Sequence, residues 1–359
     1  MTSSPPSTPI PPTTRPEAQM TETTPDRAPV IPSTMRAAVA PSYGTEEIVT
    51  IDQVETPEPG EGEVLVHVGA TSLNALDWRM MTGTPMFLRL IAGLRTPKRT
   101  IHGADVAGTV VAVGEGVEAY SVGDRVFGEC NGGGLGEYLV ARPRAITHAP
   151  AGIGIEALAA TPCAGLTAIQ GLRTHGGVEV GDHVLINGAA GGVGTFAVQI
   201  AKALGAEVTA VCSTRNVEMV CSIGADHVVD YTVEDFVPGG PRFDVMLDNV
   251  GNRSAKEVLS VLRPEARYVA VSGPMRNRLL GPIPHIARLA VRFLRASQTL
   301  KQFTAEPNAA DLEALAEMLV AGEIVPQVQR VVGLDGVREG LAEIGGSHVR
   351  SKIVVMPGR

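Results

Sequence analysis

The first regular feature of the chain is an alternation of apolar and polar residues, which is typical of strands that bury one face. Short strands of this kind, most of them bounded by glycine-rich turns, are predicted at Met35–Ala40, Glu63–Ala70, Val106–Val113, Gly123–Val126 and Gly136–Val140. Many short strands with Gly-rich turns indicate a compact β-unit, a barrel or a sandwich. We expect this unit to extend from about residue 35 to 157.

After this unit, helical periodicity alternates with short apolar runs. A helix predicted at Glu156–Thr174 is broken around Thr161-Pro162, because proline removes a backbone donor. Strands and helices then follow in turn at His183–Asn187, Val193–Leu204, Val208–Cys212, Asn216–Ile223, Val228–Val229, Asp244–Asp248, Ala255–Leu262 and Tyr268–Val271. This order predicts βαβ units on a parallel sheet, and hence an α/β fold. Mixed α and β character returns at Val325–Val355.

The segment Met275–Phe303 reads as an insertion. Ile286–Phe293 has apolar residues at helical spacing, with Arg288, Arg292 and Arg295 on another face. Such a helix covers a core or forms a dimer surface, or it lies on a membrane surface over residues 286–295. We favour the cover helix or dimer surface. No run of 18 apolar residues occurs, so no transmembrane span is expected.

Composition narrows the function classes. The net charge of −8 argues against a nucleic-acid binder, since phosphate neutralisation needs a basic face. The four cysteines form no C-x-x-C pair and are expected to be reduced thiols in the cytoplasm. Residues 1–34 are rich in Pro, Thr and Ser and lack the apolar region of a signal peptide, so we predict a disordered tail.

A glycine-rich loop between a predicted strand and helix carries the strongest functional signal. It reads Asn187-Gly188-Ala189-Ala190-Gly191-Gly192-Val193-Gly194. A diphosphate needs backbone N–H groups without obstructing Cβ atoms at the positive end of a helix dipole. Residues 188 and 190–194 are therefore predicted to bind a dinucleotide diphosphate, although Ala189 departs from G-x-G-x-x-G.

The tip of the next strand indicates which dinucleotide is bound. An NAD site has an Asp or Glu there for the ribose hydroxyls. This chain has Ser213, Thr214 and Arg215 instead. Two hydroxyls and a guanidinium suit a 2′-phosphate, so NADPH is preferred over NADH.

Several motifs in one order resemble the zinc-free quinone-oxidoreductase branch of the medium-chain dehydrogenase/reductase superfamily. They are Ser72–Asp77, Gly103–Gly108, Val122–Val126, Ala164–Ala168, Gly188–Gly194, Gly224–Asp226 and Asp248–Gly251. Val208–Cys212 and the long insertion further resemble the mitochondrial reticulon-4-interacting-protein subgroup. The resemblance implies a GroES-like β-domain over 35–157, completed by 325–359, and an inserted Rossmann domain with a doubly wound parallel sheet over 158–324, including the insertion at about 275–303.

The resemblance also implies roles for individual residues. Asn74 would lie near nicotinamide and substrate and donate to the substrate oxygen, or it caps the turn that it begins. Asp77 would relay a proton, or it caps a helix. Contacts to the nicotinamide half are implied for Thr167, Val250, Gly251, Ser272 and Gly273, and positions near the adenosine phosphate or the cleft for Tyr231 and Lys352. Asn249 is implied to bind the cofactor as well.

Zinc-dependent members of this superfamily use three side chains to bind the catalytic metal. The corresponding positions here are Asn74, Ala104 and Cys163, with His102 two positions away from the second. One thiolate is too few for a catalytic zinc site, which needs about three protein ligands. We therefore expect no metal.

The function expected from these features is hydride transfer from NADPH to a quinone, an enone or a similar small carbonyl acceptor. Two alternatives stay open: a zinc-free NADP-dependent alcohol dehydrogenase, and a protein that binds NADPH as a sensor or interaction partner with little turnover. A homodimer is also left open.

Overall fold

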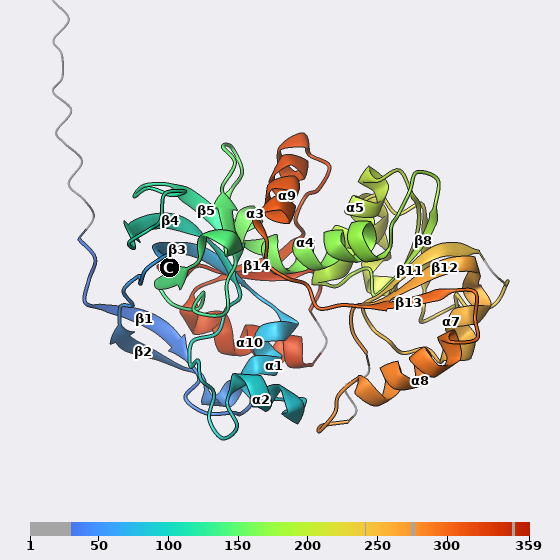
Figure 1. Cartoon of the computed structure of the whole chain (residues 1–359), viewed down its shortest axis with the longest axis horizontal. Coiled ribbons are helices and arrows are strands. Elements are labelled where there is room, and N and C mark those ends of the chain that lie inside the picture. The colour runs from blue at the N-terminus through green and yellow to red at the C-terminus, as the bar shows by residue number, and fades with distance from the viewer. Residues whose placement is uncertain (1–29, 241, 274–276, 347–348) are drawn as a thin grey trace, which may run out of the picture. The chain divides into compact units, whose positions relative to one another are not determined.

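The computed structural model describes residues 30–240, 242–273, 277–346 and 349–359 (Figure 1). The chain divides into two units, Met1–Val30 and Ile31–Arg359. Most of the predicted tail, residues 1–29, lies outside the described residues, and regular structure begins at Thr34. All that follows concerns the second unit.

A seven-stranded sheet forms the β-unit that the alternating pattern predicts. Its strands are β14 (Val328–Val332), β15 (Lys352–Val355), β3 (Val64–Leu73), β4 (Asp105–Val113), β5 (Arg125–Glu129) and β7 (Ile146–His148), with β6 (Tyr138–Ala141) beside β3. A separate ribbon pairs β1 (Thr34–Val39) with β2 (Thr50–Glu55). The sequence pattern missed β2 because only two of its six residues are apolar. β15 pairs antiparallel with β3, so the end of the chain joins the N-terminal sheet.

The second sheet is parallel and six-stranded, which confirms the α/β fold. In spatial order its strands are β10 (His227–Asp230), β9 (Glu207–Cys212), β8 (His183–Asn187), β11 (Phe243–Asp248), β12 (Leu262–Ala270) and β13 (Thr299–Gln302). The strand order reverses between β8 and β11, which is where doubly wound sheets bind ligands. β13 lies inside the segment read as an insertion. The sequence pattern did not predict this strand, because TLKQ at an exposed edge has no apolar run.

Ten α-helices are described: α1 (Ala75–Thr82), α2 (Arg89–Ala92), α3 (Ile155–Ala160), α4 (Pro162–Ile169), α5 (Gly192–Ala203), α6 (Val217–Ser222), α7 (Ala255–Val261), α8 (Ile283–Phe293), α9 (Ala309–Ala321) and α10 (Val337–Gly345). The predicted break at Thr161-Pro162 is confirmed, since α3 ends at Ala160 and α4 begins at the proline. Proline suits this first helical position, where its missing N–H is not needed. The pattern did not predict α9.

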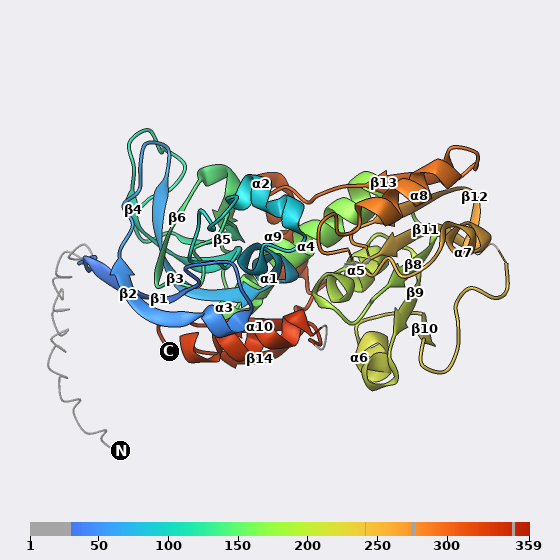
Figure 2. The ribbon, with the colours of Figure 1, turned by 90° about the horizontal axis from the view of Figure 1, so that it is seen from below.

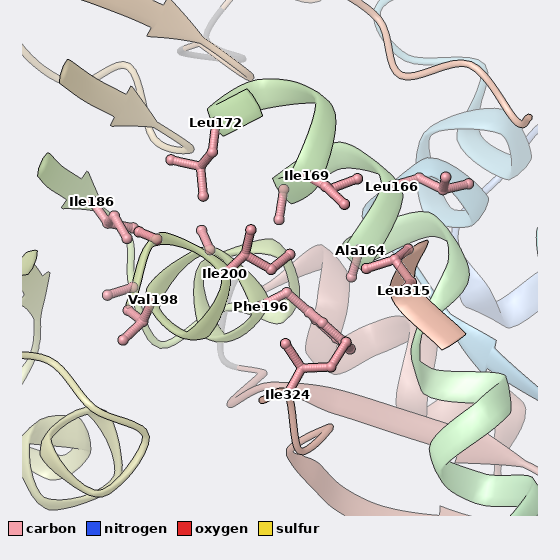
Figure 3. Close-up of a cluster of buried hydrophobic side chains, with 14 of the residues drawn as sticks. Ala164, Leu166, Ile169, Leu172, Ile186, Phe196, Val198, Ile200, Leu315 and Ile324 are labelled. Carbon is pink, nitrogen blue, oxygen red and sulfur yellow. The ribbon is translucent and has the colours of Figure 1, made fainter. Parts of the chain in front are cut away.

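One apolar cluster connects the two sheets. Figure 3 shows its centre, where Leu166 and Ile169 of α4 meet Phe196 and Ile200 of α5 and Leu315 of α9. Two alanines and a valine of the seven-stranded sheet, Ala70, Ala107 and Val354, belong to the same cluster, together with Phe127. The helices between the sheets therefore fix where the glycine loop lies relative to the β-unit.

Leu315→Ala tests this shared core. Leu315 is fully buried, and removing its methyl groups leaves a cavity that costs about 2–5 kcal/mol. Val320→Ala is the matched control, because Val320 lies on the same helix with its side chain mostly exposed and should change stability by less than about 0.5 kcal/mol. Urea unfolding monitored by circular dichroism measures both. Equal losses would contradict the assignment of α9 to the core.

Candidate functional site

The glycine loop joins β8 to α5 in the way a diphosphate site requires. Gly188 has a φ of 82°, and a Cβ on Gly194 would lie 2.2 Å from the Gly188 carbonyl oxygen. Only glycine therefore fits at position 194. Gly191 is the N-cap of α5 and, lacking a side chain, leaves the first N–H groups of the helix without a side-chain cap. Those groups can bind an anion.

A second turn, after β11, lies across the switch point from the glycine loop. Asp248 shapes this turn, because its Oδ1 accepts hydrogen bonds from the backbone N–H groups of Val250 at 2.9 Å and Gly251 at 2.8 Å. A Cβ on Gly251 would lie 2.5 Å from the Cα of Gly273, so the turns after β11 and β12 touch. Ser272, next to Gly273, is thereby held at the same edge.

Asn249 in this turn has unused hydrogen-bonding capacity. Both polar atoms of its side-chain amide are buried, and neither has a hydrogen-bond partner among the described residues. A Cβ on Gly188 would lie 3.5 Å from the Cβ of Asn249, so the amide is next to the glycine loop. Buried amides without partners are costly, which indicates that a ligand completes this site.

The last strand is attached to the glycine loop. The Ser351 N–H donates to the carbonyl of Ala190 at 2.9 Å, and Gly191 forms a parallel bridge with Ser351. A Cβ on Gly192 would lie 3.1 Å from Cδ of Lys352. The aliphatic part of Lys352 thus runs past the loop, and its ammonium group continues into the β-unit.

The Lys352 ammonium ends in a buried cluster. It lies 3.1 Å from Oδ2 of Asp105 and also donates to Oδ1 of Asn74. The Asn74 amide nitrogen donates to Asp105 Oδ2 at 2.8 Å and to the Ser72 carbonyl at 3.2 Å. Both amide hydrogens are therefore used within the protein. Asp105 and Ser72 therefore take what the Asn74 amide can donate in this structure, and the role of Asn74 as a donor to a substrate oxygen stays a prediction.

Asp105 is the centre of this cluster, and the motif reading did not identify it as a site residue. Its carboxylate also accepts from the Ser72 hydroxyl and from the Cys163 backbone N–H at 2.7 Å. It therefore joins β3, β4, the start of α4 and β15. The signal in the sequence was an acidic residue within an otherwise small and apolar stretch, Gly103–Gly108.

Asp77 binds backbone rather than side chains. Its two oxygens accept from the N–H groups of Asn74 at 2.8 Å, Gly103 at 2.9 Å and Ala104 at 3.0 Å. This is the capping alternative. Burial and the nearby Asp105 carboxylate raise the pKa of Asp77 to about 6. Asp77 also lines a cavity.

That cavity has a volume of about 520 Å³ and lies beside the buried cluster. Apolar side chains, two basic ones and a histidine form much of its wall: Leu76, Met80, Ile91, Ala92, Pro97, Lys98, Arg99 and His102, together with Asp77, Ala104, Cys130, Asn131 and Gly132. Burial lowers the pKa of His102 to about 4, and its Nε2 is buried without a partner among the described residues. The cavity suits a small, partly apolar molecule with a polar end.

Two further residues lie where the halves of the chain meet. The Arg79 guanidinium donates to the Ser272 hydroxyl at 3.2 Å, which joins α1 to the turn after β12. Burial lowers the pKa of Arg79. Thr167 lies on α4, where its hydroxyl donates to the Cys163 carbonyl at 2.7 Å. Arg79 was not among the predicted site residues.

The tip of β9 carries the predicted hydroxyls, and the structure adds a carboxylate. The Ser213 hydroxyl accepts from the Asn216 amide at 3.1 Å, and the Thr214 hydroxyl lies 2.7 Å from that of Thr232. Asp230 ends β10 in register with Cys212, and hydrogen bonds led by that from the Thr214 side chain lower its pKa. Sequence spacing missed this acid because it comes from the adjacent strand. Tyr231 follows it, with an exposed side chain.

The donor atoms near Cys163 do not fit a zinc ion. No group of three or more His, Cys, Asp or Glu side chains with suitable geometry occurs among the residues that the structure describes. Asn74 and Ala104 occupy two of the three expected positions, and the Lys352 ammonium already neutralises Asp105. Burial raises the pKa of the Cys163 thiol well above its usual value, which disfavours the thiolate that a metal needs.

Glu129 of β5 lies opposite Asp105 of β4 in an antiparallel pair. Glu129→Gln therefore tests the electrostatics of the buried cluster around Asp105. Burial, then repulsion by Asp105 and Asp77, raises the pKa of Glu129 from 4.5 to about 8. Between pH 4.5 and about pH 8 the folded protein therefore keeps a proton on Glu129 that the unfolded chain has released. The free energy of unfolding of the wild type falls as the pH rises through this range. The slope for one proton is at most about 1.4 kcal/mol per pH unit. Chemical denaturation at pH 5, 6.5 and 8 should show that the free energy of unfolding of the variant increases relative to that of the wild type as the pH rises. A constant difference would contradict the raised pKa.

Comparisons with known proteins agree with this geometry. Residues 223–355 match the family described as zinc-binding dehydrogenase, and residues 60–170 match the alcohol dehydrogenase GroES-like domain. The chain is 31% identical over 317 residues to the chloroplast envelope quinone oxidoreductase homolog of Arabidopsis thaliana, covering 85% of this chain and 93% of that protein. It is 30% identical over 380 residues to the mitochondrial NAD(P)H oxidoreductase RTN4IP1 of Bos taurus, covering 95% and 93%.

Solved structures of related proteins have the same fold. The quinone oxidoreductase from Coxiella burnetii superposes with a TM-score of 0.79 at 26% sequence identity, covering 90% of this chain and 99% of that one. The predicted GroES-like β-domain and Rossmann sheet are thereby confirmed. The glycine loop, the switch-point turns and these relatives together show that the chain is an NAD(P)H-dependent oxidoreductase belonging to the quinone-oxidoreductase-like branch of the medium-chain dehydrogenase/reductase superfamily.

Proposed function

We propose that this protein transfers hydride from NADPH to a quinone, an enone or a similar small carbonyl acceptor, without a zinc ion. The observation that carries the proposal is a doubly wound sheet with a glycine loop at its switch point, combined with a partly apolar cavity beside a buried cluster in which the Lys352 ammonium pairs with Asp105.

The described residues support a specific way of binding the dinucleotide. The N–H groups at the start of α5, from Gly191 to Gly194, would hold the diphosphate. Thr167, Val250, Gly251, Ser272 and Gly273 would contact the nicotinamide half. The unpartnered amide of Asn249 would gain hydrogen bonds from the bound cofactor. NADPH, when bound, supplies the hydride, and the protein orients it and excludes water.

The choice of NADPH rests on the tip of β9. Arg215, Ser213 and Thr214 would bind the 2′-phosphate, with Tyr231 beside the adenosine. Asp230 opposes this choice, because a carboxylate repels a phosphate and accepts from ribose hydroxyls. We propose that the guanidinium outweighs it, since Thr232 already donates to Asp230 through both its hydroxyl and its backbone N–H.

Asn74, Asp77 and Lys352 act as positioning residues in this proposal. Asn74 and Lys352 fix Asp105, and Asp77 holds the backbone at Gly103 and Ala104. Charge that develops on the acceptor oxygen would meet the Arg79 guanidinium and the Ser272 hydroxyl, which lie at the junction of the two halves.

The remaining expectations become parts of the proposal. The four cysteines are free thiols, which suits a reducing compartment such as the cytoplasm. Within the described part of the chain, every helix is too short or too polar to cross a bilayer. The net charge of −8 gives no support for nucleic acid as a partner.

The edge of the parallel sheet offers a place for a homodimer contact. Among the described strands, β13 pairs with β12 alone, which leaves an edge that a second copy could extend.

NADPH consumption, followed at 340 nm against a panel of quinones, enones and simple alcohols or ketones, tests the proposal. We expect turnover with quinones or enones that survives treatment with a zinc chelator. Activity restricted to alcohol–ketone pairs would favour an alcohol dehydrogenase. Tight NADPH binding without turnover would favour a sensor, and no binding of either dinucleotide would overturn the proposal.

Arg215→Glu tests the cofactor choice. Reversing this charge should raise the dissociation constant for NADPH by about tenfold or more, because the new carboxylate repels the 2′-phosphate. The constant for NADH should change little. Arg144→Glu is the control, since Arg144 is exposed on the β-unit, away from the strand tip. Fluorescence titration measures all three proteins. An unchanged NADPH constant in Arg215→Glu would contradict the role given to Arg215.

A further inference from the structure

Two segments of this acidic chain contain no acidic residue. Residues 78–104 carry five basic side chains and no Asp or Glu, and residues 277–303 do the same, although the whole chain has a net charge of −8. The basic residues are Arg79, Arg89, Arg95, Lys98 and Arg99 in the first segment and Arg278, Arg288, Arg292, Arg295 and Lys301 in the second. A local positive charge of this size attracts anionic partners.

The same two segments expose large apolar side chains. Leu90 is 72% exposed and Leu94 is 70% exposed around α2, and Val291 and Leu294 at α8 are 65% and 83% exposed. Other exposed apolar residues of the segments are Met86, Ile91, Leu279, Leu280 and Ile283. Scattered apolar residues on a surface are ordinary, whereas a group of this kind marks an interaction site.

Backbone hydrogen bonds join the two segments into one surface. The Met86 N–H donates to the Arg278 carbonyl at 2.8 Å, and the Phe87 N–H donates to the Leu279 carbonyl at 3.2 Å. Figure 1 shows α2 and α8 along the same lower edge of the ribbon, and Figure 2 views that edge from below. We call residues 86–99 and 277–295 together the basic apolar surface.

The helix α8 divides its side chains between the core and this surface. Leu289 and Phe293 are buried against the parallel sheet, where Phe293 stacks on Tyr268 at 5.8 Å between ring centroids. Val291 and Leu294 point away from that core and are flanked by Arg288, Arg292 and Arg295. Among the described residues, no carboxylate forms an ion pair with these arginines or with Arg95, Lys98, Arg99 or Arg278.

We propose that the basic apolar surface docks on an anionic lipid bilayer. The exposed leucines and Val291 would enter the boundary between headgroups and acyl chains, while the arginines would bind lipid phosphates. Both contributions favour binding at an interface. The charge complementarity decides the occupant. A second copy in a two-fold contact would bring arginines against arginines, with no carboxylate in either segment to pair with them.

The position of the cavity gives this docking a use, an argument that rests on the proposed function. Ile91, Lys98 and Arg99 belong to the basic apolar surface and also line the 520 Å³ cavity. A molecule dissolved in the bilayer could therefore reach the cavity without crossing water. The acceptor class that fits is a lipophilic quinone or enone delivered from the membrane.

Co-sedimentation of the full chain with vesicles tests the docking itself. We expect binding to phosphatidylcholine vesicles that contain phosphatidylglycerol and much weaker binding to pure phosphatidylcholine. The variant Arg288→Glu/Arg292→Glu/Arg295→Glu should lower the partition coefficient on the order of a hundredfold or more, since each basic residue near an anionic surface contributes about a factor of five. Leu90→Asp/Leu94→Asp should lose binding as well.

Matched controls separate docking from folding. Arg144→Glu and Val320→Asp change an exposed cation and an exposed valine outside the surface, and both should bind vesicles like the wild type. Equal binding to neutral and anionic vesicles, or none to either, overturns the proposal. So does sedimentation velocity if it shows a wild-type dimer that the triple arginine variant abolishes, because the surface would then be a contact between copies.

A second readout addresses the delivery of substrate. The triple arginine variant should keep its NADPH oxidation rate with a water-soluble quinone and lose most of the rate with a long-chain quinone held in anionic vesicles. Vesicle binding without turnover of either quinone would refute the proposed function and leave the docking intact. Equal rates in wild type and variant with the vesicle-held quinone would refute delivery from the membrane.

Discussion

The buried ammonium group of Lys352 is the constraint on which the site depends. The residue is 1% exposed, and its side chain passes the glycine loop before it reaches Asp105 and Asn74. A buried charge is tolerated only when it is paired and hydrogen-bonded. The pairing therefore forces the start of β15, the end of β3 and the start of β4 into one arrangement. The loop that would hold the cofactor and the wall of the cavity are thereby fixed relative to each other.

The same pairing sets the electrostatics of the buried cluster. The Lys352 ammonium lies against Asp105, and burial raises the pKa of the Cys163 thiol well above its usual value. Burial and neighbouring carboxylates raise the pKa values of Asp77 and Glu129, and the Lys352 ammonium opposes both shifts. Outside this cluster, Arg79 and Ser272 form a polar pair at the junction of the two halves of the chain.

Both halves of the chain contribute to the basic apolar surface. The Rossmann half uses Leu289 and Phe293 of α8 to cover its sheet, and the opposite face of that helix is free for contact. The β-unit contributes α2 and the residues after it, which also form the cavity wall. In the proposal, the segment 86–99 serves both membrane contact and substrate access, because Ile91, Lys98 and Arg99 also line the cavity.

The sequence alone determined the fold class, the dinucleotide loop and most element positions, because these depend on local periodicity and on glycine at positions where a Cβ cannot fit, such as Gly194. Tertiary structure decided the rest. Asp105, Asp230 and Arg79 gained their importance from residues far away in the chain, and the amide hydrogens of Asn74 were taken by Asp105 and Ser72. β13 became a strand because β12 offered it a partner. Such roles arise from pairing across the fold, which no local pattern encodes.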